Sequence, residues 1–306
     1  MSINITKDDL IYPYFIQEGV NKKSAIKSFP GVYRFSIDRL LGDIEETRQL
    51  GVRKILLFGI PLSKYPDARS AYALDNIVAR AVKKIKQEFR DIVVMTDVCL
   101  CAYTTHGHCR VLKKDAKGPD NKKTLEALSK IALSHAASGA DWVAPSAMAK
   151  NQVSAIRKTL DKNGFKDTKI MGYSAKFASN FYGPFRNAAS SAPRSGDRRP
   201  YQLDFRDGKQ ALKKIVDDIK EGADIVMVKP ALSYLDVIKE ARSKFNHSLA
   251  AYNVSGEYAF VKYGARQGLW DEKKMVFEIL ASIKRAGADL IITYHAKDVA
   301  KWLKEL

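Results

Sequence analysis

The chain is poor in cysteine and has neither a long apolar run nor an apolar leader. No stretch approaches 18 consecutive apolar residues, which excludes a transmembrane helix. The first ten residues are polar and lack the apolar core of a signal peptide, so we expect a cytoplasmic protein with no membrane partner. The three cysteines, an odd number within eleven residues, make a poor disulfide framework and a better metal site.

Acidic residues are also scarce. The 306 residues include 34 Asp and Glu against 52 Lys and Arg, which gives a net charge of +18. Such a basic chain raises the question of nucleic acid, but a nucleic-acid footprint concentrates on one face or arm. Here the basic residues are spread over nearly every segment. We therefore expect solvated helix faces and no nucleic-acid partner. The alternative is a positive field that assists an anionic small substrate.

The pattern of apolar runs predicts one (β/α)₈ TIM barrel, an α/β fold, over residues 10–306. Eight short runs predict strands: Leu10–Ile16, Ile55–Phe58, Ile92–Thr96, Trp142–Ala144, Ile170–Tyr173, Ile225–Val228, Leu249–Val254 and Leu290–Tyr294. Seven stretches between them predict helices: Ile37–Leu50, Asn76–Phe89, Lys123–Ser138, Val153–Asn163, Lys209–Glu221, Tyr234–Phe245 and Glu272–Arg285. Eight alternations favour the barrel. An open doubly wound sheet fits less well, because no Gly-x-Gly-x-x-Gly follows an early strand.

Two segments lie outside this alternation. Residues 1–9 form a short N-terminal arm. Residues 187–207, the lid segment, are rich in Gly, Ser, Pro and Arg and are too long for a routine connection. Several arginines, Arg186 and Arg198 among them, lie in or beside this segment. We therefore expect an active-site lid that recognises a carboxylate.

Chemically active side chains follow the predicted strands, where barrel enzymes carry their catalytic groups. Lys229 closes an apolar run and Lys176 follows the preceding strand, so the two amines could be close. Burial and a nearby cation both lower the pKa of an amine and free it to attack a ketone. The alternative for either lysine alone is a snorkelling side chain. Asp97, Ser255 and Tyr294 lie at other strand ends.

The cysteines have the spacing Cys-x-Cys-x₇-Cys. On a strand Cys99 and Cys101 would point the same way, and the following loop could bring Cys109 to them. Three thiolates leave one tetrahedral position open, as in a catalytic zinc site. His106 and His108 in the loop are further possible ligands. The alternative is three buried small residues and two ordinary histidines.

Several motifs resemble those of the porphobilinogen synthase (5-aminolevulinate dehydratase) family. They are CLCAYTTHGHC at 99–109, YSAKFAS at 173–179, FYGPFR at 181–186, GDRRPYQ at 196–202, MVKPA at 227–231 and VSGEYA at 254–259. The similarity runs in order from about Leu10 to Leu303. It implies a hydro-lyase of tetrapyrrole (heme) biosynthesis that condenses two molecules of 5-aminolevulinate to porphobilinogen with loss of two waters.

The resemblance also implies roles for the strand-end residues. Lys229 would hold the first substrate and Lys176 the second, each as an imine. Ser255 and Tyr294 would bind the carboxylate of the first substrate. Asp97 would be a catalytic residue that lines the pocket.

Further roles concern the second substrate and the metal. Arg186, Arg198 and Gln202 would bind the second carboxylate, and Tyr182 and Phe185 would belong to the substrate-binding wall. The three cysteines would carry Zn²⁺ that polarises the second substrate or a bound water. The resemblance leaves open whether an additional, regulatory Mg²⁺ binds.

The chain departs from the family pattern in places that bear on assembly. Lys150 and Asn151 stand where the family has Asp-Gly, and Arg110 replaces a usual glycine. Family members carry an arm of some 20 or more residues that wraps a neighbour in an octamer, whereas nine residues reach about 30 Å at most. We expect a homo-oligomer reduced to dimers or another small assembly. The alternative is that the octamer persists.

Two other functions explain parts of the sequence. A class I aldolase-type barrel with one Schiff-base lysine accounts for Lys229 but gives no role to Lys176 or the cysteines. A binding protein on a catalytically decayed barrel is disfavoured because both lysines and all three cysteines are retained.

Overall fold

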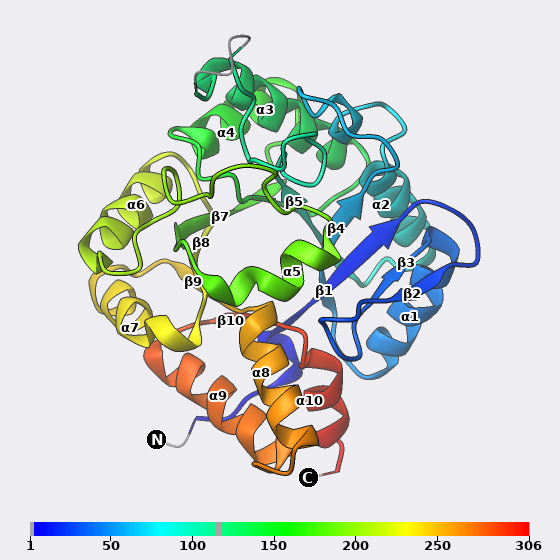
Figure 1. Cartoon of the computed structure of the whole chain (residues 1–306), viewed down its shortest axis with the longest axis vertical. Helices are drawn as coiled ribbons and strands as arrows, with labels where there is room; N and C mark the ends of the chain where they lie inside the picture. The colour runs from blue at the N-terminus through cyan, green and yellow to red at the C-terminus, as the bar shows by residue number, and fades with distance from the viewer. Residues whose placement is uncertain (1–2, 114–117, 306) are drawn as a thin grey trace.

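The strands form a closed parallel barrel in the computed structural model, which describes residues 3–113 and 118–305 (Figure 1). In chain order the barrel strands are β1 (Leu10–Gln17), β4 (Lys54–Ile60), β5 (Val93–Val98), β6 (Trp142–Pro145), β7 (Lys169–Lys176), β8 (Ile225–Lys229), β9 (Ser248–Asn253) and β10 (Leu290–Thr293). Each pairs in parallel with the next, and β10 returns to β1 through Leu10 opposite Ile291. The predicted (β/α)₈ fold and its eight strands are confirmed.

The helices surround the barrel in Figure 1. Those that match the predicted stretches are α1 (Ile37–Gln49), α2 (Ile77–Glu88), α3 (Asn121–Ala137), α4 (Gln152–Lys162), α6 (Gly208–Lys220), α7 (Leu235–Lys244) and α9 (Glu272–Ala286). The sequence did not predict α5 (Gly183–Ala188), α8 (Ser255–Arg266), α10 (Ala296–Trp302), or the short strands β2 (Lys23–Ala25) and β3 (Tyr33–Phe35). Helix α5 crosses the mouth of the barrel. Within the described ranges, no helix combines the length and apolar character needed to cross a membrane.

The sequence Gly-Ala-Asp occurs at 139–141, 222–224 and 287–289, each time between a helix and the barrel strand that follows it. Its three glycines have left-handed φ values of 98°, 98° and 126°, which end the helices. Each aspartate then accepts the backbone N–H of the preceding barrel strand. The bonds are Val94 N to Asp141 Oδ2 (2.7 Å), Ile170 N to Asp224 Oδ2 (2.7 Å) and Leu249 N to Asp289 Oδ2 (2.8 Å). The motif thus joins neighbouring strands at the N-terminal end of the barrel, away from the strand ends that carry the lysines.

The barrel strands are buried on both faces, as their continuous apolar runs predicted. Side chains such as Phe15, Met171 and Tyr252 fill the interior, while Leu57, Val143 and Val226 pack outward against the helices. Of the predicted arm, Met1 and Ser2 lie outside the described residues, and η1 (Lys7–Asp9) is a single 3₁₀ turn that leads into β1. The packed interior leaves the C-terminal strand ends as the place for chemistry.

Candidate active site

Two buried lysines lie side by side at the C-terminal ends of β7 and β8. Lys176 and Lys229 are register partners in the sheet, with 6% and 4% of their surfaces exposed. Lys176 Nζ donates a hydrogen bond of 2.6 Å to the carbonyl oxygen of Ser146. Lys229 Nζ lies 3.9 Å from the ring centre of Tyr252 and 4.9 Å from that of Tyr173. The structure therefore places together the two amines that the sequence reasoning singled out.

The surroundings of Lys229 favour its neutral amine. Burial and then the positive charge of Lys176 hold the pKa of Lys229 well below its usual value, and the attraction of Asp97 only partly offsets them. Asp97 is the penultimate residue of β5, and its Oδ1 has no hydrogen-bond partner among the described residues. Burial raises the pKa of Asp97 to about 6, while Lys176 acts in the opposite direction. Two amines and one carboxyl group thus share a single low-dielectric space.

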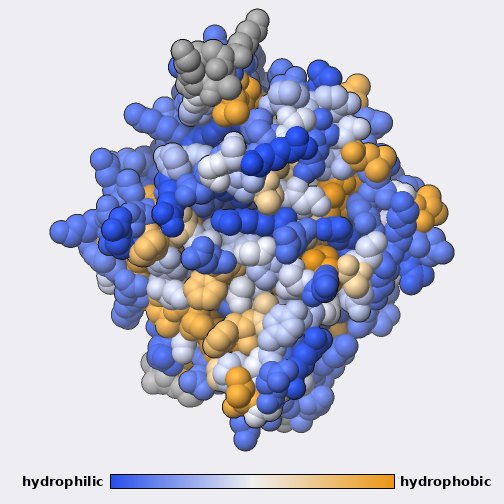
Figure 2. Space-filling model, in the orientation of Figure 1, coloured by the Kyte–Doolittle hydropathy of each residue, from blue (hydrophilic) through white to orange (hydrophobic). Residues whose placement is uncertain are grey.

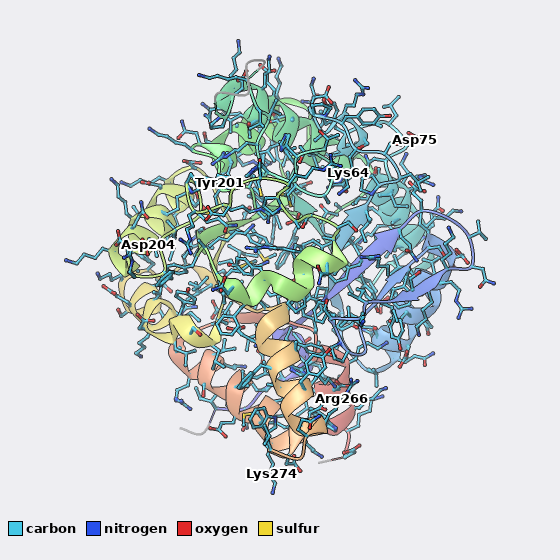
Figure 3. All side chains as sticks on the ribbon, viewed as in Figure 1. Lys64, Asp75, Tyr201, Asp204, Arg266 and Lys274 are labelled. Carbon is cyan, nitrogen blue, oxygen red and sulfur yellow. The ribbon has the colours of Figure 1, made fainter. Side chains whose placement is uncertain are left out.

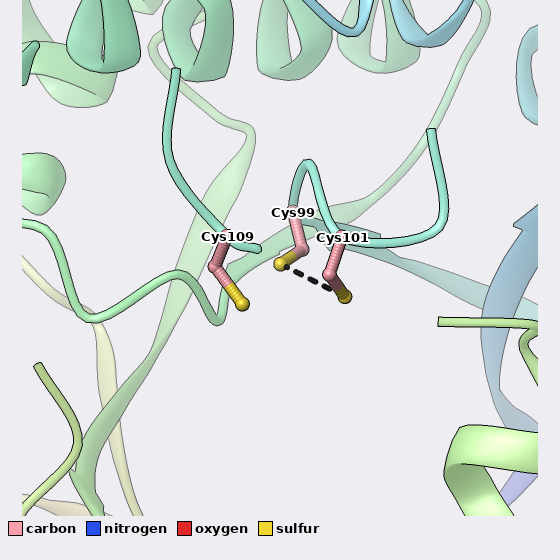
Figure 4. A group of neighbouring side chains, drawn as sticks. All are labelled: Cys99, Cys101 and Cys109. Atoms are coloured by element: carbon pink, nitrogen blue, oxygen red, sulfur yellow. Dashed lines mark hydrogen bonds between the residues drawn. The ribbon is translucent and has the colours of Figure 1, made fainter. Parts of the chain in front are cut away.

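The three cysteines converge directly after β5 (Figure 4). The strand ends at Val98, so Cys99 and Cys101 lie in the following loop and not on a strand. All three thiols are buried, and their sulfur atoms lie within 4.8 Å of one another. The sulfurs of Cys99 and Cys101 are 3.5 Å apart. A tetrahedral ion with Zn–S bonds of about 2.3 Å separates its sulfurs by about 3.8 Å, so the cluster fits such an ion.

The charges of the thiols also fit a cation. The hydrogen bonds that the Cys99 thiol donates to Cys101 and Cys109, followed by burial, raise the pKa of Cys99, whereas the hydrogen bonds that Cys109 accepts from its two partners lower the pKa of Cys109. The three groups therefore do not all ionise easily without a compensating positive charge. The geometry and the donor set together make the cluster a candidate metal site.

Neither histidine of the loop joins the cluster of sulfur atoms. His108 uses both ring nitrogens elsewhere: Nδ1 contacts Tyr201 Oη at 3.1 Å, and Nε2 contacts the carbonyl oxygen of Ser195 at 3.0 Å. The Nδ1 atom of His106 accepts the backbone N–H of His108. His108 thus attaches the cysteine loop to the lid segment.

Further hydrogen bonds dock the lid segment over the strand ends. Arg198 is 4% exposed, and its Nη2 donates to the carbonyl oxygens of Gly107 (3.0 Å) and Ser191. The backbone N–H of Leu203 donates to the carbonyl oxygen of Lys176 at 3.0 Å. The lid segment therefore contacts both the cysteine loop and the strand that carries Lys176.

A cavity of about 430 Å³ opens beneath the lid segment and contains the predicted carboxylate-binding residues Arg186, Arg198 and Gln202. We call it the arginine cavity. Gln202 is 5% exposed, and neither of its amide atoms has a partner among the described residues. The Nε atoms of Arg186 and Arg198 are also buried and unpaired there. Unused donors around a cavity are suited to a carboxylate. Figure 2 shows that hydrophilic side chains cross the middle of this face.

The remaining predicted residues lie around Lys229. Tyr182 Oη donates to the carbonyl oxygen of Lys229 at 3.1 Å, and Lys229 Nζ lies 5.1 Å from the ring centre of Phe185. Ser255, the first residue of α8, accepts the N–H of Phe185 through its Oγ at 3.0 Å. Tyr294 follows β10, and its Oη contacts that of Tyr252 at 3.0 Å.

Sequence reasoning missed several residues of this site. Tyr173 and Tyr252, whose rings flank Lys229, lie in two of the predicted strands, and no role at the site was predicted for either. Ser146 contributes a backbone oxygen, which no side-chain motif reveals. A tyrosine inside an otherwise aliphatic strand was the available signal, because a barrel interior rarely needs a phenol unless a polar group is near.

Comparison with known proteins gives the family. The sequence profile of the family described as delta-aminolevulinic acid dehydratase matches residues 1–302. The chain belongs to the delta-aminolevulinic acid dehydratase family. Relatives with this name include a protein of Archaeoglobus fulgidus, 49% identical over 98% of this chain and 92% of that one. Another, from Bacillus subtilis, is 48% identical over 97% and 91%.

A solved structure of the same family is closely similar. It is the delta-aminolevulinic acid dehydratase (porphobilinogen synthase) of Toxoplasma gondii in complex with the reaction product porphobilinogen. The two structures superpose with a TM-score of 0.97 at 40% sequence identity, over 99% of this chain and 87% of the other.

The structure accommodates the two departures from the family pattern. Asn151 replaces a family glycine and has φ = 62°, a left-handed conformation that asparagine tolerates better than most residues. Arg110 lies with its guanidinium 5.1 Å from the ring centre of Tyr201, and its Nη2 donates to the carbonyl oxygen of Met148 at 2.5 Å. Arg110 thus connects the cysteine loop, the lid segment and the β6–α4 loop.

Proposed function

We propose that the chain condenses two molecules of 5-aminolevulinate to porphobilinogen, with loss of two waters. The observation that carries this proposal is the pair of buried lysines in register beside a three-thiol cluster. A single-lysine aldolase would leave the second amine and the thiols without a role. Membership of the family supports the same reaction.

Lys229 would hold the first substrate. Its lowered pKa favours the neutral amine, whose nitrogen can attack the ketone carbon. Loss of the ketone oxygen as water then gives the imine. The rings of Tyr173 and Tyr252 exclude water from this nitrogen, and Ser255 and Tyr294 would bind the carboxylate. Asp97 is proposed as the group that exchanges protons beside the two amines.

The second substrate would occupy the arginine cavity. Its carboxylate would take the unused donors of Arg186, Arg198 and Gln202, which presents the ketone to Lys176 for a second imine. Since Leu203 on the lid segment bonds the backbone of Lys176, binding in this cavity also fixes the strand end that carries the amine.

We propose Zn²⁺ as the ion of the three cysteines, held by thiolates with one position open. When bound, the ion would polarise the second substrate or a water. Support for an additional Mg²⁺ is weak. Besides the cysteines, the described ranges contain one group with ligand spacing, formed by Glu272, His295 and Asp298. The ammonium group of Lys262 already pairs with both of its carboxylates.

We also propose that the chain is cytoplasmic and forms a homo-oligomer. Its catalytic domain would be the barrel of residues 10–306, in which residues 187–207 act as a lid. Exposed apolar side chains support self-association. Phe260 is 65% exposed and its ring lies tilted against that of Trp270, and Leu269 is 69% exposed. Light scattering coupled to size-exclusion chromatography measures the assembly.

The reaction is tested by incubating the purified protein with 5-aminolevulinate and zinc and by measuring porphobilinogen with an aldehyde reagent specific for pyrroles. The control is Lys239→Ala, which removes a lysine of the outer helix α7. Porphobilinogen from the wild type and the control supports the proposal. Imine formation without any pyrrole would instead indicate an aldolase-type reaction, and no imine at all would refute both.

A further inference from the structure

A second cavity, about 500 Å³ in volume, lies outside the barrel mouth, where α6, the β6–α4 loop and the lid segment meet. We call it the lysine cavity. Its charged and lid-side walls are formed by Lys150, Lys213, Lys214, Lys220, Tyr201 and Leu203. Figure 3 labels Tyr201 on the side of the molecule where α6 lies. None of the roles proposed above uses this cavity.

The lysine cavity has an excess of positive charge. Two carboxylates, Asp217 and Glu221, also line it, but Glu221 is partly engaged because it accepts the backbone N–H of Ser154 at 3.2 Å. Lys214 pairs with the buried Asp218, which leaves three of the four lysines without an ion pair among residues 3–113 and 118–305. Unpaired ammonium groups around a concave surface are suited to a small anion of more than one charge.

The residue type distinguishes this cavity from the arginine cavity. Planar guanidinium groups match a carboxylate in a bidentate way, whereas lysine is a point charge that commonly binds phosphate. The lysine cavity contains lysines from two elements, with Lys150 on the β6–α4 loop and the others on α6. An ester or inorganic phosphate could contact both elements at once.

The wall nearest the barrel is built from the residues that dock the lid segment. Tyr201 Oη contacts His108 Nδ1 at 3.1 Å and accepts the backbone N–H of Cys109 at 3.4 Å. Leu203 exchanges backbone hydrogen bonds with the strand end of Lys176, donating to its oxygen and accepting from Ala178 N at 2.8 Å. The lysine cavity therefore has its full shape only while the lid segment is docked.

We propose that the lysine cavity is a regulatory binding site for a phosphate-bearing anion. A ligand that binds only the docked arrangement stabilises it by linkage, and the docked lid in turn strengthens the ligand's binding. Occupancy therefore lowers the KM for 5-aminolevulinate, because Arg198 and Gln202 are then held in place. This effect on KM rests on the proposed function, whereas the binding itself does not.

The test uses the zinc-loaded full chain with inorganic phosphate and glucose 6-phosphate as probes, at ionic strength matched with chloride. Calorimetry measures binding to the wild type, to Lys150→Gln/Lys213→Gln, and to the control Lys83→Gln/Lys84→Gln. The control removes the same charge from exposed positions on α2. We expect saturable binding to the wild type and the control, and at least tenfold weaker binding to the cavity variant.

Two further measurements connect binding to the lid. Hydrogen exchange of the amides in residues 197–205 should slow on addition of phosphate to the wild type, and the KM should fall at least twofold. Neither should change in the cavity variant. Binding by glucose 6-phosphate alone would identify an ester as the ligand, and binding by both probes would identify the phosphate group itself.

The outcomes separate this inference from the proposed function. Equal binding to the cavity variant and the control, or no saturable binding to the wild type, would overturn the inference even if porphobilinogen forms. Specific binding with slowed exchange but no porphobilinogen would support the site and overturn the proposed function instead.

Discussion

The arginine cavity allows a sharp prediction, because its two arginines differ in what else they hold. The Arg198 side chain donates to the carbonyl oxygens of Gly107 and Ser191, whereas the Arg186 side chain makes no hydrogen bond among the described residues. Arg186→Met should therefore remove a substrate contact and little else. Arg198→Met should also leave two buried carbonyl groups without a donor.

The magnitudes follow from these contacts. A hydrogen bond to a charged group contributes about 1.5–3 kcal/mol, so Arg186→Met should raise the KM for 5-aminolevulinate roughly 10- to 150-fold. The free energy of unfolding in urea should change by less than about 0.5 kcal/mol. Arg198→Met should weaken the same binding and also lower the free energy of unfolding, by about 1–3 kcal/mol for each unpaired carbonyl.

The assay combines three measurements on each variant. Initial rates of porphobilinogen formation give the KM, urea titration gives the stability, and mass spectrometry after borohydride reduction gives the substrate trapped on Lys229. The control is Arg206→Met, because Arg206 is exposed and pairs with Asp204 in the same lid segment but outside the cavity. Loss of the Lys229 adduct in Arg186→Met, or an equal KM change in the control, would refute the division between the two substrates.

Three other predictions test the remaining parts of the site. Lys229→Ala should lower porphobilinogen formation on the order of 10³-fold or more and abolish borohydride trapping at that position; normal turnover would exclude the two-imine mechanism. Chelation should remove about one zinc per chain together with activity, and zinc should restore both, as metal analysis of the protein would show; full activity without metal would contradict the thiolate site. Burial raises the pKa of Glu257 to about 7 from 4.5, so its stabilising contribution is complete below pH 4.5 and is lost as the pH rises through 7. Relative to Glu257→Gln, the wild type should lose about 3 kcal/mol of unfolding free energy between pH 4.5 and 8 in urea titrations, and a pH-independent difference would disprove this.

Much of the barrel could be predicted because its strands are buried on both faces. A strand such as Ile225–Lys229 has an uninterrupted apolar run that ends at one charged residue, and this pattern gives both the strand and the candidate nucleophile. The short helices could not be predicted in the same way. Helix α5 has six residues, and α8 contains exposed Phe260 and Tyr263, which blur the apolar periodicity.

The sequence was sufficient to identify the reactive side chains of the site, but it did not predict most of the contacts that hold them. The lysines and cysteines lie at strand ends or in one short loop, so the fold alone brings them near one another. The carbonyl oxygen of Ser146 and the attachment of His108 to Tyr201 depend on how loops from different parts of the chain meet. The predicted strand Ile92–Thr96 already left Cys99 and Cys101 after its end, and in the structure β5 ends at Val98, so both lie in the following loop.

The pairing of β1 with β10 has a consequence for how the protein is made. The first strand of the barrel finds one of its two barrel neighbours only when the last strand, Leu290–Thr293, has been synthesised. Until then the growing chain exposes the edge of β1 at Leu10 and Ile11 and the edge of the latest strand, both apolar, and such edges promote aggregation. A chain that stops before residue 290 would keep both lysines and all three cysteines and still lack a closed barrel. Premature termination close to the end should therefore yield insoluble protein, which a cell clears by proteolysis, in place of a shortened but working enzyme.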